Sequence, residues 1–166
     1  MNDFHYVPLS IPKTFPFSMT FNQNFTKYWL PVICWMGVIL WMSTETFSTG
    51  NTSFWIEKIL FLLFPGISSE QAELIHVFLR RAGHITEYFI LGLLLFRAFR
   101  GGSAAPWNWR WFWGTLIVVV LWAAIDEFHQ SFVPARTASI IDVGIDIAGG
   151  IVAQLVIAIG YRYRKK

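Results

Sequence analysis

The chain has 166 residues, of which 55% are hydrophobic and only 14% are charged, whereas roughly a quarter of the residues in a soluble domain are charged. This composition excludes an ordinary soluble globule, because such a fold could not hide so much apolar surface from water. The formal net charge of +3 does not indicate a nucleic-acid partner, since the basic residues lie at the ends of apolar runs and not along one polar face. The single cysteine, Cys34, permits no intramolecular disulfide and no cysteine metal cluster.

The N-terminal segment 1–26 holds prolines and polar residues, but no basic-then-apolar stretch that ends at a small-residue cleavage site. We expect an irregular cytoplasmic tail there and no secretory signal peptide. The remainder, 27–166, is predicted to be one all-α domain of a polytopic membrane protein, because lipid offers no partner to the backbone of an open strand. Four transmembrane helices are predicted, at 28–43, 83–99, 111–130 and 138–161.

A shorter apolar and aromatic segment, 54–64, lies between the first two predicted spans and ends at Pro65 and Gly66. It is too short to cross a bilayer, so it is predicted to be either an interfacial or a re-entrant helix. Ser68, followed three residues later by Gln71, has the pattern of a capping box. The second long helix is therefore predicted to begin before it enters the membrane.

The distribution of Lys and Arg predicts the orientation of the four spans. In this topology, nine basic residues fall on the side of the termini and four on the other side. The nine are Lys13, Lys27, Arg97, Arg100, Arg110, Arg162, Arg164, Lys165 and Lys166, and the four are Lys58, Arg80, Arg81 and Arg136. We therefore expect both termini in the cytoplasm.

The uninterrupted apolar runs are shorter than the roughly 20 residues of a normal span, so each span must include polar residues at one end. On the second span, Arg80, His84 and Glu87 are spaced by four and three, which places them on one helix face. On the third, Asp126 and Gln130 share a face by the same spacing. All these residues fall at the predicted extracytoplasmic ends of the spans.

On the fourth span, Asp142 and Asp146 are one turn apart and continue into Gly149, within a strip of small residues that lets another helix approach closely. Ionisable groups at membrane depth are costly and usually face a protein interior or a cavity. We therefore predict one polar pocket that opens at the outer interface. Its predicted lining is Arg80, Arg81, His84, Glu87, Tyr88, Asp126, Glu127, Gln130, Arg136, Asp142 and Asp146.

Structural roles remain open for some of these residues. Asp142 follows Ser139 by three residues and could complete a capping box at the start of the last helix. Asp146 lies one turn deeper, and its structural alternative is a salt bridge to an arginine that serves helix packing.

The motifs resemble those of the VanZ-like family of bacterial membrane proteins over roughly residues 42–160. They are Arg80-Arg81-x-x-His84-x-x-Glu87-Tyr88, then Asp126-Glu127-x-x-Gln130 with Arg136, then Asp142-x-x-x-Asp146-x-x-Gly149. Members usually carry lysine at the position of Arg81 and often asparagine at that of Asp146. The resemblance implies a multi-pass protein of the bacterial cell membrane, in a family whose founding member is associated with low-level resistance to the glycopeptide teicoplanin.

The first functional hypothesis is that the protein binds or handles an anionic membrane lipid or a lipid-linked cell-envelope precursor. Arg81 and Arg136 would bind its phosphate or carboxylate by charge-assisted hydrogen bonds. No cofactor is expected, and no residue is assigned as a metal ligand.

Two other hypotheses remain. In a membrane-embedded enzyme, His84 or Glu87 would act as the general base, and Asp126, Glu127 or Asp142 would hold a divalent cation. No recognised catalytic motif supports that hypothesis, because the chain has no nucleophile elbow, no His-Glu-x-x-His helix and no phosphate-binding glycine loop. In a small transporter, the same carboxylates would relay protons.

Overall fold

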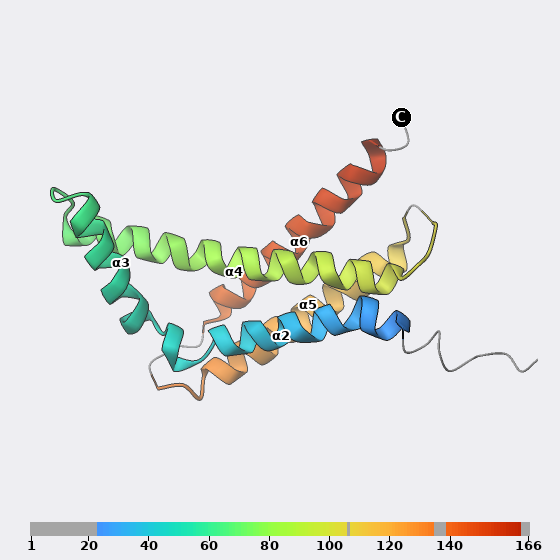
Figure 1. Cartoon of the computed structure of the whole chain (residues 1–166), viewed down its shortest axis with the longest axis horizontal. Helices are drawn as coiled ribbons and strands as arrows, with labels where there is room; N and C mark the ends of the chain where they lie inside the picture. The colour runs from blue at the N-terminus through green and yellow to red at the C-terminus, as the bar shows by residue number, and fades with distance from the viewer. Residues whose placement is uncertain (1–22, 106, 135–138, 164–166) are drawn as a thin grey trace, which may run out of the picture.

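The computed structural model describes residues 23–105, 107–134 and 139–163, and all the regular structure in them is helical (Figure 1). The elements are a π-helical turn η1 (Phe25–Trp29), α2 (Leu30–Met42), a 3-10 turn η2 (Glu45–Phe47), α3 (Thr49–Leu63), α4 (Ser69–Arg100), α5 (Trp109–Gln130) and α6 (Ile140–Tyr163). The predicted all-α fold is confirmed. The predicted tail 1–26 lies outside the described residues except for 23–26, which are helical.

Four helical stretches of the described chain are long and apolar enough to cross a membrane, as predicted. They are Phe25–Met42, Ser69–Arg100, Trp109–Gln130 and Ile140–Tyr163. The second is much longer than the span predicted from the sequence, because it begins at the predicted capping box. Gln71 N donates to Ser68 Oγ at 3.2 Å, and Ser68 N donates to Gln71 Oε1 at 3.0 Å. With 32 residues, α4 is about 48 Å long, against roughly 30 Å of hydrocarbon core.

The long helix α4 is the centre of the bundle and contacts α2, α3, α5 and α6, with its largest contact to α6 (Figure 1). The two helices approach closely because glycine, which has no side chain, stands at the points of contact. A Cβ added to Gly149 would lie 2.5 Å from the backbone oxygen of Ile85, and one added to Gly92 would lie 2.8 Å from the Cβ of Ala153. The predicted small-residue strip of α6 is therefore a packing surface, and it determines how near the polar residues of α4 and α6 can come.

Below the polar residues the helices pack around an apolar core. Its buried members are Val32, Ile39, Tyr88, Leu91, Leu95, Ala98, Val119 and Ala123. Large apolar side chains such as Ile117, Leu121 and Leu155 are exposed on the outside of the bundle. Exposed aliphatic side chains on long helices suit a lipid environment.

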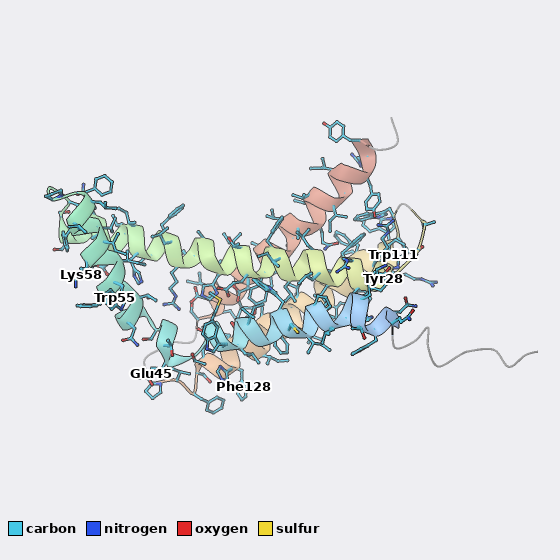
Figure 2. The ribbon with its side chains drawn as sticks, in the orientation of Figure 1. Tyr28, Glu45, Trp55, Lys58, Trp111 and Phe128 are labelled. Atoms are coloured by element: carbon cyan, nitrogen blue, oxygen red, sulfur yellow. The ribbon has the colours of Figure 1, made fainter. Side chains whose placement is uncertain are left out.

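The two ends of the bundle differ in chemistry. Figure 2 shows Tyr28 and Trp111 at one end and Glu45 and Phe128 at the other. We call the first the basic end, where α2 begins, α4 ends and α6 ends, and the second the acidic end, where α2 and α5 end and α6 begins. Both ends carry aromatic side chains, as expected for the two interfaces of a bilayer.

The segment predicted as an interfacial or re-entrant helix is helical and is longer than predicted, from Thr49 to Leu63. It packs beside the first part of α4, which extends beyond the rest of the bundle at the acidic end (Figure 1). Phe54, Trp55 and Leu62 are exposed on it. Whether α3 lies in the interface or re-enters the bilayer stays a prediction.

Candidate functional site

Buried polar side chains gather where α2, α4, α5 and α6 meet at the acidic end. Those with at most 8% of their surface exposed are Ser43, His84, Asp126, Glu127, Gln130 and Asp146. They come from four helices that are far apart in the sequence, and each carboxylate among them has at least one donor.

Asp126 is the most enclosed acid on α5, and both of its oxygens accept hydrogen bonds. Ser43 Oγ, just after the end of α2, donates to Oδ1, and Gln130 Nε2 donates to Oδ2 at 3.0 Å. Gln130 reaches Asp126 because the two residues are one helical turn apart. Ser43 therefore ties the end of α2 to α5 through a carboxylate that would be costly to bury without donors.

His84 and Asp146 join α4 to α6. His84 Nδ1 lies 3.0 Å from Asp146 Oδ1, and both side chains are buried. Since a carboxylate oxygen accepts, the proton of this hydrogen bond is on Nδ1, and the ring orientation of His84 is held by Asp146. This contact is the salt-bridge alternative considered for Asp146, with a histidine in the place of the arginine.

The start of α6 is held by two further contacts. Glu127 accepts a hydrogen bond from the backbone N of Ser139, the contact that the sequence pattern offered to Asp142. Asp142 instead lies 3.5 Å from Arg80, measured from Oδ2 to Nη2. The capping alternative for Asp142 is thus replaced by Glu127, which comes from the neighbouring helix and was not identifiable from local spacing.

Some buried polar atoms of the site have no hydrogen-bond partner within the part of the chain that the structure describes. They include the Tyr88 hydroxyl, Asp146 Oδ2 and Glu127 Oε2. Tyr88 is fully buried beside the cluster, one turn beyond His84. Unpartnered buried polar atoms are uncommon and mark places where a water or a ligand group would gain hydrogen bonds.

A cavity of about 220 Å³ opens beside this cluster, between the end of α2, α3 and α4. Its polar lining consists of Ser43, Thr52, His76, Arg80, His84 and Glu87. Thr52 Oγ1 lies 3.0 Å from His76 Nε2, which links α3 to α4 across the cavity. Hydroxyl, imidazole and guanidinium groups dominate this wall, whereas Asp126 and Asp146 lie behind it.

Three residues of the site were missed in the sequence: Ser43, Thr52 and His76. His76 had a usable signal, because it stands four residues before Arg80, which stands four before His84, so it continues the same helix face. Ser43 and Thr52 carried no such pattern. Each is a single hydroxyl residue near a helix end, and only the packing of α2 and α3 against α4 brings them to the site.

The structure brings most of the predicted pocket residues together, but not all of them. Arg81 is exposed and does not line the cavity, since adjacent residues on a helix point about 100° apart and Arg80 faces inward. The prediction for Arg136 lies outside the described residues. Among those residues, no group of three His, Cys, Asp or Glu side chains is placed to hold a metal ion.

A model of the VanZ/LLP1 family matches residues 28–161. The match extends from the first candidate span to near the end of the last, and it includes every residue of the buried polar cluster. No curated protein and no solved structure matches the chain.

Proposed function

Because the chain belongs to the VanZ/LLP1 family and has four helices suited to crossing a membrane, we propose that it binds the anionic head group of a membrane lipid or of a lipid-linked cell-envelope precursor. The binding site is the 220 Å³ cavity at the acidic end, which faces the outside of the bacterial cell. A contribution to teicoplanin resistance belongs to the same proposal, because that drug acts on exposed cell-wall precursors.

The observation that carries this proposal is the placement of Arg80, His76 and His84 along one wall of the cavity. Arginine forms paired, charge-assisted hydrogen bonds with phosphate and carboxylate groups, and imidazole can add a further donor.

Asp126 and Asp146 are held by donors behind the wall. Glu87 lines the cavity and Asp142 lies 3.5 Å from Arg80, so a head group would share the Arg80 guanidinium, which has five N–H donors, with Asp142. A volume of about 220 Å³ accommodates the phosphate or carboxylate of a head group, while the rest of the ligand stays outside the cavity.

The outward orientation is supported by the excess of Lys and Arg on the side of the termini. It can be tested by labelling single cysteines in intact cells with a membrane-impermeant reagent, in a Cys34→Ser background. Ser69→Cys at the start of α4 is expected to react, and Ser103→Cys after its end is not. The opposite result would put the cavity on the cytoplasmic side.

The decisive experiment is mass spectrometry of the lipids that the protein retains after purification in a mild detergent. We expect an anionic lipid or lipid-linked precursor to be retained by the wild type and about tenfold less by Arg80→Gln, from the loss of one charge-assisted hydrogen-bonding group. Arg81→Gln is the matched control, because it removes the same charge from the adjacent, exposed position. Equal retention by the two variants, or no anionic species on the wild type, contradicts the proposal.

A second candidate is an enzyme that modifies the bound head group, and the contact between His84 and Asp146 favours it. A carboxylate that orients one imidazole nitrogen, on a histidine that also lines a cavity, is the arrangement of a general base. In that case His84→Gln would keep the bound lipid but stop its conversion. Incubation of the wild type with its own retained lipid, followed by mass spectrometry over time, separates the two candidates, since a binding protein leaves the lipid unchanged.

A further inference from the structure

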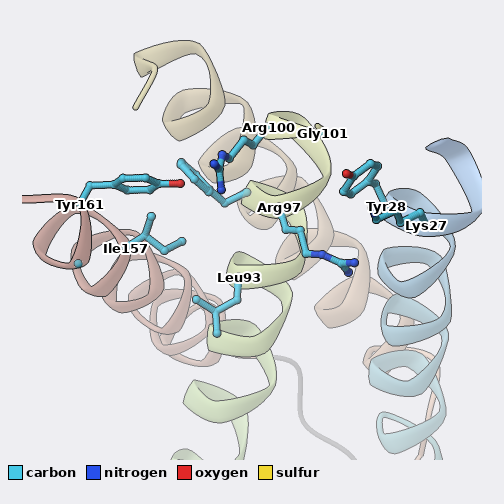
Figure 3. Close-up of a pocket in the computed structure, with 10 residues that line it drawn as sticks. Lys27, Tyr28, Leu93, Arg97, Arg100, Gly101, Ile157 and Tyr161 are labelled. Carbon is cyan, nitrogen blue, oxygen red and sulfur yellow. The ribbon is translucent and has the colours of Figure 1, made fainter. Parts of the chain in front are cut away.

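The basic end of the bundle contains a second, larger cavity, of about 540 Å³, which shares no residue with the cavity at the acidic end. It lies between η1, the last turns of α4 and the end of α6 (Figure 3). Lys27, Arg97 and Arg100 line it, together with Tyr28 and Tyr161. A cavity with three cations and two phenol rings is suited to an anionic ligand.

Aromatic rings hold these cations in place around the cavity. Arg97 Cζ lies 5.5 Å from the ring centroid of Tyr28, and Lys27 Nζ lies 5.2 Å from the same centroid. Arg100 Cζ lies 5.6 Å from the ring centroid of Tyr161, and Figure 3 shows the two side chains pointing toward one another. Cation–π contacts position a cation without neutralising it, so the charges remain available to an anion.

The described part of the chain places no acidic residue beside these cations. The stretches 4–44, 88–125 and 147–166 include all the described residues of the basic end, and they contain no Asp or Glu. Moreover, the Nε atom of Arg100 is buried and has no hydrogen-bond partner within the described part of the chain. Among the described residues, no carboxylate balances these cations, which leaves them available to an anionic ligand.

The deeper wall of the same cavity is apolar. Leu93 and Phe96 on α4 and Ile157 on α6 line it, and Figure 3 shows Leu93 and Ile157 further from the end of α4 than Arg100. A free phosphate ion would contact the basic rim and leave this wall uncovered. A ligand with an anionic head and a hydrocarbon tail would cover both, and basic pockets between transmembrane helices bind such lipids.

We propose that this cavity is a binding site for an anionic phospholipid of the leaflet at the basic end, which the Lys and Arg distribution assigns to the cytoplasmic side. The phosphate lies between Arg97, Arg100 and Lys27, and an acyl chain runs along the apolar wall between α4 and α6. This site is independent of the function proposed for the acidic end.

The test is a titration of the purified protein, in a neutral detergent, with phosphatidylglycerol, followed by native mass spectrometry. Phosphatidylcholine with the same chains is the zwitterionic comparison, and glycerol phosphate is the water-soluble one. Removing one basic residue near anionic lipid is expected to weaken binding about fivefold, so the double variant Arg97→Gln with Arg100→Gln should lose about thirtyfold. The matched control is Arg110→Gln with Arg162→Gln, which removes the same charge from exposed positions outside the cavity and should change affinity less than fivefold.

A third variant keeps every charge and fills the space instead. Gly160 lines the cavity, and a Cβ added to it would meet no atom within 4 Å, so Gly160→Leu should fold normally and still reduce phosphatidylglycerol binding. If both double variants lose the same affinity for phosphatidylglycerol, the lipid is attracted by the overall charge of the protein, and the proposed site is wrong. Displacement of phosphatidylglycerol by an equal concentration of glycerol phosphate would show that the site takes free phosphates, which overturns the assignment to a lipid. If the double variant Arg97→Gln with Arg100→Gln does not fold, the test depends on Gly160→Leu. Unchanged phosphatidylglycerol binding by Gly160→Leu then overturns the proposal.

Discussion

The acidic and the basic ends of this bundle handle charge in opposite ways. At the acidic end each buried acid meets a donor from the protein, as Asp126 meets Ser43 and Asp146 meets His84. At the basic end Arg97 and Arg100 lie against aromatic rings, and no acid among the described residues faces them. Ionisable groups near a membrane must be compensated either within the fold or by the surroundings. The acidic end uses the first way, and we propose that lipid supplies the second at the basic end.

The largest difference between the two ends is expected from substitutions at two glycines of α6. Gly149→Val, on the side of the acidic end, should prevent folding, because the first added carbon already meets the backbone of Ile85 at 2.5 Å and α4 and α6 would have to separate. Gly160→Val, at the basic end, has open space and should give normal yield. Size-exclusion chromatography in detergent would show the difference. A monodisperse Gly149→Val protein would mean that the close helix contact does not hold the acidic end together.

A smaller effect is expected from Asp126→Ala. It removes the buried carboxylate that accepts from the hydroxyl of Ser43 and the amide of Gln130, and the loss of these two hydrogen bonds costs about 1–3 kcal/mol and lowers the thermal midpoint by about 2–10 °C. Glu45→Ala is the control, since Glu45 is an exposed acid at the same end. Differential scanning fluorimetry in detergent measures both variants. Equal midpoints for the two would show that internal compensation at the acidic end contributes no stability.

The smallest expected effect separates the two ends by ionic strength. Salt screens exposed charges much more than buried ones, with a Debye length of about 10 Å at 0.1 M and about 3 Å at 1 M. Raising the salt concentration over that range should weaken phosphatidylglycerol binding at the basic end severalfold, while the thermal midpoint, which depends on the buried contacts at the acidic end, stays nearly constant. A midpoint that falls as steeply as lipid binding would remove the distinction.

Helical periodicity was sufficient to predict that His84, Asp126 and Asp146 lie in one cluster, because each falls at the polar end of a span on a definite helix face. Periodicity was not sufficient for Arg81. It follows Arg80 directly in the sequence, but its side chain is exposed and does not line the cavity. The specific partners were also not predictable. Whether Glu127 or Asp142 holds the start of α6 depends on how far the helices rotate and tilt, which is determined by contacts such as Gly149 against Ile85.

The basic cavity was not predicted at all. In the sequence, Lys27, Arg97 and Arg100 are isolated residues near span ends, and their number served only to orient the spans. The cavity exists because η1, α4 and α6 converge there with Tyr28 and Tyr161 beside the cations, which is a property of tertiary packing. By contrast, the four spans and the capping box at Ser68 depend on local patterns, and they were predicted correctly.

The helix α4 has a mechanical consequence for both cavities. It runs without a proline from Ser69 to Arg100, and it carries Arg80 of one cavity and Arg97 of the other, about 26 Å apart along its axis. That spacing is close to the thickness of a bilayer's hydrocarbon core. In a thinner or thicker bilayer this stiff rod must change its tilt, and both arginines then shift together relative to the lipid phosphates. A change in membrane thickness would therefore alter the positions of Arg80 and Arg97 relative to the lipid phosphates at the same time.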